Sequence, residues 1–533
     1  MSASLPWIDM RFLQNMTSTL VLGNDMLYLP QSRKIFSQGE ISLAPEDREI
    51  FKRILSGLYE IFTGAGDAFL LFQAEQQYLR DTEMDGQEPD WIEEISDDAK
   101  RHLRHNAAVQ GILPSFEPLA IVPSLPHTGI SYIVREEGLL EKLIRAFGIW
   151  RLANIRQLGF LQDPIVTSSG ARGYSLDFPH TRYCHVLDVT AIMTLMLHNN
   201  FLDPVLIHTG MMAAITHDTE TPAGGDSIKF IDPEAFDEDK NYPQLLKKVD
   251  WSAIQKEYQI PEDLLIDTIQ NQGALGTMLD LADKMAYVAR DATSYLSRTQ
   301  PFGTIAYPEG YRNIAQLLNQ FPFICGVWET AKIIRDETVI TDAKKLIAFL
   351  KLRALLFREL YHHPGARFKE FLLGTTVLEY LYKTGKLTRE RLLCMTDYEL
   401  EHEIDEVLGF PYAIHTLNGA ENVRVELFCP GNEENAYQRE TELVQGGRVV
   451  TIIENMGKDV KPATHFVVEK ERGLYLPLRG AFPEEAAEIE EIAENPFPIR
   501  LYYFNEEPTG FSSSFIKNFI AYRKREREKR TKS

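Results

Sequence analysis

The sequence predicts a mainly α-helical protein that ends in a smaller α+β module. Apolar residues recur with helical spacing from about residue 127 to residue 404, and stretches rich in glycine and proline interrupt them. After residue 404 the spacing changes to alternation, with Val423, Val425 and Leu427 separated by charged residues, which indicates a strand. A chain of 533 residues is also too long for a single hydrophobic core.

We therefore expect three regions along the chain. They are a mainly helical N-terminal region over residues 1–120, a multi-helix core over 121–404, and a small α+β module with a basic tail over 405–533. Within the first region, residues 45–79 have the apolar spacing of a helix. Within the last, we expect strands at 423–427, 448–454, 464–471 and 500–504, a helix at 484–494, and a solvated helix end at 522–533.

The composition is that of a globular protein and limits the classes of function. Hydrophobic residues make up 44% and charged residues 25% of the chain, and the formal net charge is −21. Such an acidic chain is not expected to have nucleic acid as its main partner, although a few convergent cations can still hold a small anion. The four cysteines form no CxxC pair, and the N-terminus has no secretory signal. No apolar run is long enough to cross a membrane, so we expect a cytoplasmic protein without a membrane partner.

Two histidines and two aspartates form the most informative pattern in the chain. His185 begins one apolar helical stretch, the adjacent pair His217–Asp218 ends another, and Asp283 lies within a third. Imidazole nitrogens together with carboxylate oxygens suit a divalent transition metal better than calcium. The four residues are therefore candidate metal ligands, and the cofactor is expected to be a divalent ion among Mn, Mg, Fe, Co, Ni and Zn.

The third of these stretches has further polar residues at helical spacing. Asp283, Tyr287 and Asp291 recur every four residues and so lie on one helical face, which Lys284 borders. Carboxylates, an ammonium group and an aromatic ring along one face are typical of a nucleotide-binding edge. A solvated polar face is the alternative interpretation.

The order H…HD…D resembles the signature of the HD phosphohydrolase superfamily, so the predicted core is a multi-helix HD domain. Four segments, covering roughly residues 125–375, narrow the resemblance to the dNTP triphosphohydrolases, which include bacterial dGTP triphosphohydrolases and the animal enzyme that joins a SAM domain to an HD domain. The segments are RLANIRQLG (151–159), HTRYCH (180–185), DKMAYVARD (283–291) and KLRALLFRELYHH (351–363).

The resemblance implies metal-dependent hydrolysis of a dNTP to the deoxynucleoside and inorganic triphosphate by a homo-oligomer. It also implies the roles of individual residues. The metal ligands would be His185, His217, Asp218 and Asp283. The residues gripping the triphosphate would be Arg182, Lys284 and Arg353. The residues around the sugar and base would be Gln157, Leu158, Tyr287, Asp291, Tyr361 and His362, with Asp291 accepting a hydrogen bond from the 3′-hydroxyl and His362 bearing on base preference.

The chain departs from this family directly after the HD pair. The family has further histidines there for acid–base catalysis, but this chain reads HDTETPAGGDS and has no histidine between His217 and His362. Because proton transfer needs a positioned group of suitable pKa, Glu220 or Asp226 is the candidate to replace them, acting beside Asp218. We favour a hydrolase. The alternatives are an HD-type 5′-nucleotidase or phosphodiesterase, and a catalytically weak dNTP-binding regulator.

Overall fold

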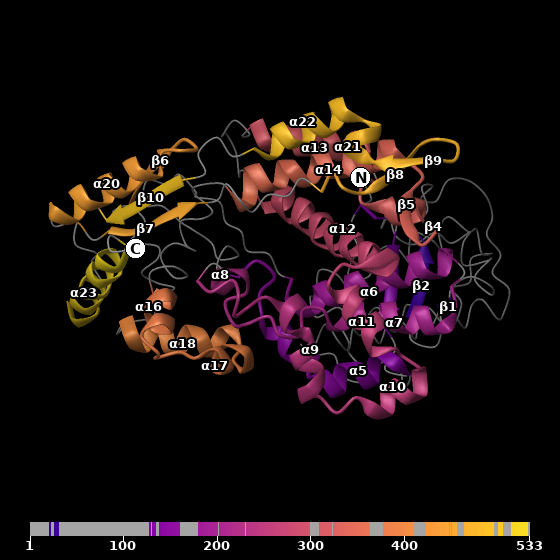
Figure 1. Cartoon of the computed structure of the whole chain (residues 1–533), viewed down its shortest axis with the longest axis horizontal. Coiled ribbons are helices and arrows are strands. Elements are labelled where there is room, and N and C mark those ends of the chain that lie inside the picture. Colours follow the sequence, from indigo (N-terminus) through magenta and orange to yellow (C-terminus); the bar gives the residue numbers. More distant parts are fainter. Residues whose placement is uncertain are drawn as a thin grey trace, which may run out of the picture. The chain divides into compact units, whose positions relative to one another are not determined.

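The computed structural model describes the chain in segments. These are residues 21–22, 26–30, 127–128, 130–134, 138–159, 180–200, 202–229, 231–298, 309–321, 323–362, 377–408, 423–446, 448, 450–455, 463–494, 499–504 and 513–530. The helix that the sequence predicts over residues 45–79 lies outside these segments. In the described segments the protein is mainly α-helical with a smaller α+β part, which confirms the predicted fold class (Figure 1).

The chain forms two compact units. The first comprises Met1–Phe147, Val186–Thr216 and Asp250–Ala289, and the second comprises Gly148–His185, His217–Val249 and Arg290–Ser533. The two long helices α6 (Arg182–Asn199) and α12 (Gly273–Arg298) each supply residues to both units. These two units do not test the predicted division of the sequence into three regions, which stays a prediction.

The first unit is built around buried helices. Besides parts of α6 and α12, its elements are β1 (Val21–Leu22), β2 (Met26–Pro30), β3 (Ile130–Val134), α5 (Leu139–Phe147), α7 (Pro204–Thr216), α10 (Ser252–Tyr258) and α11 (Glu262–Ile269). The strands form an antiparallel sheet in the order β1-β2-β3. Helix α7 packs against α5 and α11, and its residues Thr209–Thr216 are all buried. A helix that is apolar on every side belongs in a core, which explains why α7 shows no polar face in its second half.

The second unit contains most of the described chain. Its elements are η1 (Ile149–Asn154), α8 (Asp226–Lys229), α9 (Glu238–Lys248), α13 (Glu309–Gln320), η3 (Gly326–Thr330), β4 (Ala331–Ile334), β5 (Glu337–Ile340), α14 (Ala343–Leu356), η4 (Phe357–Tyr361), α16 (Glu379–Lys383), α17 (Arg389–Cys394), α18 (Asp397–Leu408), β6 (Val423–Phe428), α20 (Glu433–Gln445), β7 (Val450–Asn455), β8 (Val467–Glu471), β9 (Leu474–Pro477), α21 (Leu478–Ala481), α22 (Pro483–Ala493), β10 (Ile499–Phe504) and α23 (Ser513–Arg530).

The strands predicted after residue 404 are present. Strand β10 lies between β6 and β7 and is antiparallel to both, and Leu443 of α20 packs with Leu501 of β10 in a small core. Strands β8 and β9 belong to a different sheet, of order β4-β5-β8-β9, in which β5 and β8 run parallel. The predicted helix 484–494 is α22, which packs beside α14 (Figure 1).

A hairpin interrupts the stretch that the sequence indicates as helix after helix. Strands β4 and β5 pair antiparallel through a turn at Arg335 and Asp336, both with positive φ (54° and 64°). Two consecutive left-handed residues match the twist of a hairpin, but arginine and aspartate are weaker signals for it than Asn-Gly. The short apolar runs on either side are equally compatible with helix and strand, so periodicity alone misses this element.

Among the described residues, no helix combines the length and the apolar character that a bilayer span requires.

Candidate metal centre

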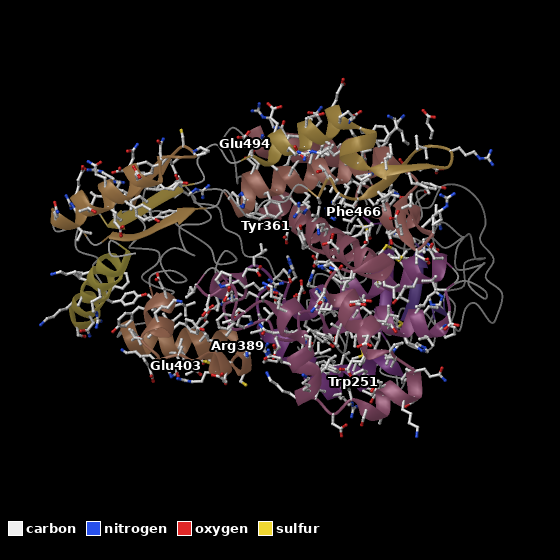
Figure 2. The ribbon with its side chains drawn as sticks, in the orientation of Figure 1. Trp251, Tyr361, Arg389, Glu403, Phe466 and Glu494 are labelled. Atoms are coloured by element: carbon white, nitrogen blue, oxygen red, sulfur yellow. The ribbon has the colours of Figure 1, made fainter. Side chains whose placement is uncertain are left out.

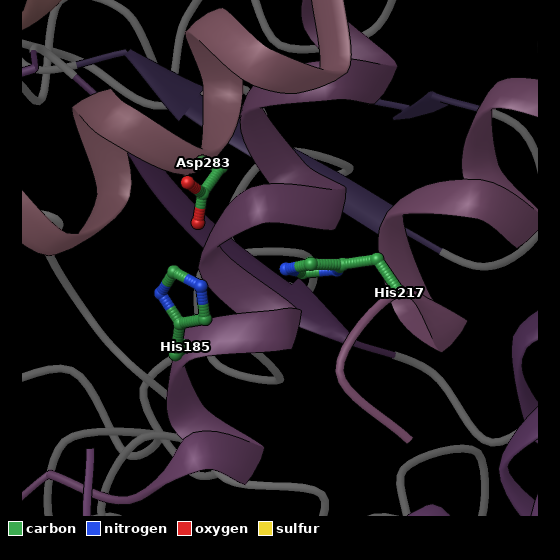
Figure 3. A group of neighbouring side chains, drawn as sticks. All are labelled: His185, His217 and Asp283. Atoms are coloured by element: carbon green, nitrogen blue, oxygen red, sulfur yellow. The ribbon is translucent and has the colours of Figure 1, made fainter. Parts of the chain in front are cut away.

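His185, His217 and Asp283 lie together in the structure. His185 is in the first turn of α6, His217 directly follows α7, and Asp283 lies in α12. Each offers one ligand atom, and these atoms are all within 4.8 Å of one another, so that the three side chains converge on one point (Figure 3). The donors of one ion, each about 2.0–2.2 Å from it, are at most about 4.4 Å apart. Two imidazoles and a carboxylate at this spacing therefore fit a divalent transition metal after small side-chain adjustments.

Asp218, the fourth predicted ligand, lies between the two histidines. One carboxylate oxygen is 3.8 Å from Nε2 of His185 and the other is 3.8 Å from Nε2 of His217. Arg182 donates a hydrogen bond of 2.9 Å to the same carboxylate. Burial alone would raise the pKa of Asp218, but the charges of Arg182, His217 and His185 lower it well below its usual range. Asp218 is therefore a carboxylate at neutral pH, which is the form that binds a metal.

The Asp218–Arg182 pair continues into a chain of alternating charges. Arg182 also donates to Asp226 at 2.6 Å, and Lys229 bridges Asp226 at 3.1 Å and Glu238 at 2.6 Å. Burial would lower the pKa of Arg182 and Lys229, but their acidic neighbours raise both. Burial would raise the pKa of Asp226, but Arg182 and Lys229 lower it. Arg182 is thus a fixed cation beside the candidate metal ligands, and Asp226 is held ionised.

Lys229 and Glu238 are polar residues of this site that the sequence interpretation misses. Glu238 is at the start of α9, where it accepts a hydrogen bond of 2.8 Å from the hydroxyl of Thr221. Burial is the main cause that raises the pKa of Glu238, and Lys229 opposes it. The spacing of Asp226 and Lys229, three residues apart, is a weak signal for an ion pair on a helix. The sequence near Glu238 contains no motif that predicts a role, because only the fold brings this residue to the loop that contains Thr221.

Glu220 occupies a different position from Asp226. Its carboxylate accepts from Lys248 at 3.1 Å and from Arg389 of α17 at 3.3 Å, and Arg389 also donates to the carbonyl of Ala235 (Figure 2). Two cations hold each of these carboxylates, but only Asp226 shares one of them, Arg182, with Asp218. Of the two candidate acid–base residues, Asp226 is the one connected to the candidate metal ligands.

Asp291 lies on the same helix as Asp283 and is fully buried. One carboxylate oxygen is 3.0 Å from Nε2 of His180, and the other accepts a hydrogen bond from the hydroxyl of Tyr361. Tyr361 ends the π-helical turn η4, a geometry that is common at functional sites (Figure 2). Asp291, which the resemblance assigns to the 3′-hydroxyl, is therefore held between the side chains of His180 and Tyr361.

The other residues predicted to contact the nucleotide differ in burial and in their polar partners. On α12, Tyr287 is partly buried and Lys284 forms an ion pair with Asp280. Gln157 and Leu158 are buried, at 4% and 8% exposure. The side-chain oxygen of Gln157 has no hydrogen-bond partner among the described residues.

Arg353 lies in the last turn of α14, and His362 directly follows η4. Both are buried, and both contact the ring of Phe357, with the Arg353 guanidinium 4.5 Å from its centroid and the His362 ring edge-on to it. The carbonyl of His362 accepts a hydrogen bond from the buried Arg500 of β10. Phe357 thus orders the arginine that the resemblance assigns to phosphate and the histidine assigned to the base.

Comparison with known proteins gives structural likeness only. No protein-family model matches the chain, and no curated protein matches it. Among solved structures, it is similar to a hypothetical protein from Aquifex aeolicus, with 16% identity and a TM-score of 0.48 over 70% of this chain and 94% of the other. It is also similar to a phosphohydrolase from Bacteroides thetaiotaomicron, with 15% identity and a TM-score of 0.48 over 70% of this chain and 96% of the other.

Proposed function

We propose that the chain is a metal-dependent phosphohydrolase that acts on deoxynucleoside triphosphates. The observation that carries the proposal is the convergence of His185, His217 and Asp283, with Asp218 between the histidines. Two imidazoles and two carboxylates would hold one divalent ion, which supplies Lewis-acid activation of a phosphoryl group and of water. Next to such a centre, a buried cation held by carboxylates, as Arg182 is, favours a phosphate ester over a neutral substrate.

The residues of the chain then have distinct tasks. Arg182 is charged and fixed by two carboxylates, so it is suited to bind phosphate oxygens beside the metal ligands. Asp226, whose side chain is 45% exposed, is held ionised and is suited to orient a water molecule or accept its proton. Asp291 would accept a hydrogen bond from the 3′-hydroxyl and its partner Tyr361 would pack on the deoxyribose, in the roles that the resemblance to dNTP triphosphohydrolases implies.

The test is a product assay with purified protein and each of the four dNTPs, in the presence of Mn²⁺, Mg²⁺ or Co²⁺. We expect deoxynucleoside and inorganic triphosphate in equal amounts, separated by ion chromatography, and loss of both products with EDTA. Release of phosphate or pyrophosphate would contradict the proposed bond and support a nucleotidase or phosphodiesterase. The matched control is His185→Ala, which removes one candidate ligand.

A dNTP-binding regulator is the second candidate. The observation that favours it is the state of the two carboxylates after the HD pair, because Glu220 is held by two cations and the pKa of Asp226 is lowered. An aspartate that is held ionised is not a natural proton donor at neutral pH, so Asp226 lacks the proton that a departing group would need. Thermal stabilisation by dNTPs without any product, with all three metals, would establish this function instead.

The resemblance also implies assembly, and the scattered cysteines of the sequence favour a reducing compartment. We propose a homo-oligomer in the cytoplasm, where the four cysteines stay reduced. Light scattering of the purified protein at several concentrations, with and without dNTP, measures the assembly directly. A mass of 61.0 kDa under all conditions would contradict it.

A further inference from the structure

Asp397 connects two segments that are far apart in the sequence. It is the first residue of α18 and is 6% exposed. One of its carboxylate oxygens accepts the backbone N–H of Gly224 at 2.7 Å, and the other accepts the backbone N–H of Arg156 at 2.8 Å. Hydrogen bonds to an ionised acceptor are shorter and stronger than neutral ones, so a single buried side chain ties both backbones.

The two tied segments also touch each other through glycines. Gly159 has a φ of +53°, and a Cβ placed there would lie 2.5 Å from the carbonyl oxygen of Gly224. Gly225 has a φ of +55°, and a Cβ there would lie 3.5 Å from Cα of Gly159. At Gly159 the backbones approach at a distance that only glycine permits, and at Gly225 the positive φ favours glycine. The carboxylate of Asp397 therefore links two backbone segments that already contact each other at their glycine turns.

The helices that carry Asp397 and its neighbours support the same connection. Arg151 donates to the carbonyls of Thr219 and Thr221 and, at 3.0 Å, to the carbonyl of Met395, just before α18. Glu401, one turn after Asp397, forms an ion pair with the side chain of Arg156. Thr396 and Glu399 cap α18, with the Glu399 carboxylate accepting the Thr396 N–H at 2.7 Å.

We propose that Asp397 is a positioning residue. It holds the segment with Gln157 and Leu158 in a fixed arrangement relative to the loop that follows the His217–Asp218 pair. The proposal rests on the proposed function. Arg156 precedes Gln157 and Leu158, the predicted contacts of the nucleotide, and Gly224 precedes Asp226 by two residues. Nucleotide position and carboxylate position are thus set by the same side chain. A misplacement of about 1 Å in such a site lowers the rate about 100-fold.

The experiment compares Asp397→Asn with Glu401→Gln. The amide of Asp397→Asn keeps one acceptor oxygen but turns an N–H₂ donor toward the other backbone N–H, whereas Glu401→Gln weakens only the neighbouring ion pair with Arg156. Hydrogen exchange is measured on residues 151–159 and 219–226, with α14 as the reference. We expect exchange at least about tenfold faster in both segments of Asp397→Asn, unchanged exchange in α14, and a much smaller change in Glu401→Gln.

Kinetics with dGTP and Mn²⁺ supply the second measurement. We expect kcat of Asp397→Asn to fall about 10- to 100-fold while bound metal stays at the wild-type level. Asp397→Glu, which keeps the charge and displaces the carboxylate, is the second variant if Asp397→Asn does not fold, and it should show the same loss of kcat.

The outcomes separate the two proposals. If the wild-type protein hydrolyses no dNTP, the proposed function fails, while the exchange data still decide whether Asp397 ties the two segments. Exchange that rises in neither segment overturns the tie. Faster exchange in both segments with an unchanged kcat overturns the positioning role.

Discussion

At the scale of single residues, the candidate site is organised by pairs of opposite charges. Arg182 is shared by Asp218 and Asp226, and Lys229 is shared by Asp226 and Glu238. Of these pairs, Arg182–Asp218 is buried on both sides, and removing one partner from a buried pair leaves an uncompensated charge at a cost of about 3–5 kcal/mol. Substitutions that preserve shape are therefore better probes here than truncation to alanine.

The pair Asp226→Asn and Glu220→Gln tests which carboxylate acts after the HD pair. We expect Asp226→Asn to lower kcat for the preferred dNTP about 100-fold or more, because the residue is linked to Asp218 through Arg182. Glu220→Gln should change kcat by about threefold at most, a small effect for a carboxylate outside the proton-transfer step. Both variants should keep the wild-type metal content. Equal rates for Asp226→Asn and the wild type would remove Asp226 from the mechanism.

Asp239 gives the stability of the protein a pH dependence of its own. Burial, with Glu238 and Asp237, raises the pKa of Asp239 to about 7, whereas an unfolded aspartate has a pKa of about 3.9. The folded protein therefore binds this proton more tightly, so its contribution to stability is complete below about pH 4 and is lost as the pH rises through 7.

Asp239→Asn removes this loss because an amide does not ionise. We expect the variant to be more stable than the wild type at pH 8, by on the order of 2 kcal/mol, and equal to it near pH 4. Urea unfolding across this range measures the difference, with the exposed Asp263→Asn as the control. A difference that is the same at both pH values would contradict the raised pKa.

At the scale of elements, the site depends on where helices begin and end. His185 lies in the first turn of α6, His217 follows the last residue of α7, and Asp226 begins α8. The turn before α6 is fixed by a bridge between Arg156 and Thr181 and by the N–H of Arg182, which donates to the carbonyl of Ile155 at 2.8 Å. Helix ends thus place the two histidines and Asp226, whereas Asp283 lies inside α12, and glycine turns set the distance between the loops.

Gly159→Ala tests the glycine contact. A Cβ at this position would meet the carbonyl oxygen of Gly224 at 2.5 Å, in addition to the strain of a φ of +53°. Gly385→Ala is the matched control, since Gly385 has a φ of +74° but no atom within 4 Å of its Cβ position. We expect Gly385→Ala to cost about 1–2 kcal/mol and Gly159→Ala distinctly more, measured by urea unfolding. Equal costs would mean that the two loops separate without penalty.

At the scale of the whole molecule, metal binding and folding are expected to be linked. The three convergent ligands come from α6, from the residue after α7 and from α12, so an ion bound by them holds distant parts of the chain together. An ion that binds only the folded state stabilises it by about 2.7 kcal/mol at 100 times its Kd. The acidic chain, with a net charge of −21, also gains from a bound cation.

Thermal unfolding with added Mn²⁺ measures this linkage. We expect Tm of the wild type to rise by several degrees and the rise to be reversed by EDTA. Asp218→Asn should abolish the rise, since an amide is a poor metal ligand, and Asp263→Asn on the surface of α11 should preserve it. An equal rise in all three proteins would indicate non-specific binding to the acidic surface.

The sequence by itself determined the mainly helical class, the strands after residue 404 and the identity of the candidate metal ligands. Apolar periodicity is a local property of the chain, and an imidazole or carboxylate beside an apolar helix is visible without the fold. The sequence did not predict the hairpin β4–β5, because the short apolar runs on either side of its turn have no distinctive period.

Only the tertiary structure brings residues without a motif to the candidate site. Glu238, Lys229, Arg151 and Asp397 carry no motif, and their partners lie up to hundreds of positions away, as with Arg151 and Met395. The tertiary structure also separated Glu220 from Asp226, two acids six residues apart with different partners. The physical reason is that ion pairs and hydrogen bonds act over about 3 Å, so the path of the folded backbone, and not the order of the sequence, selects the partner of each charge.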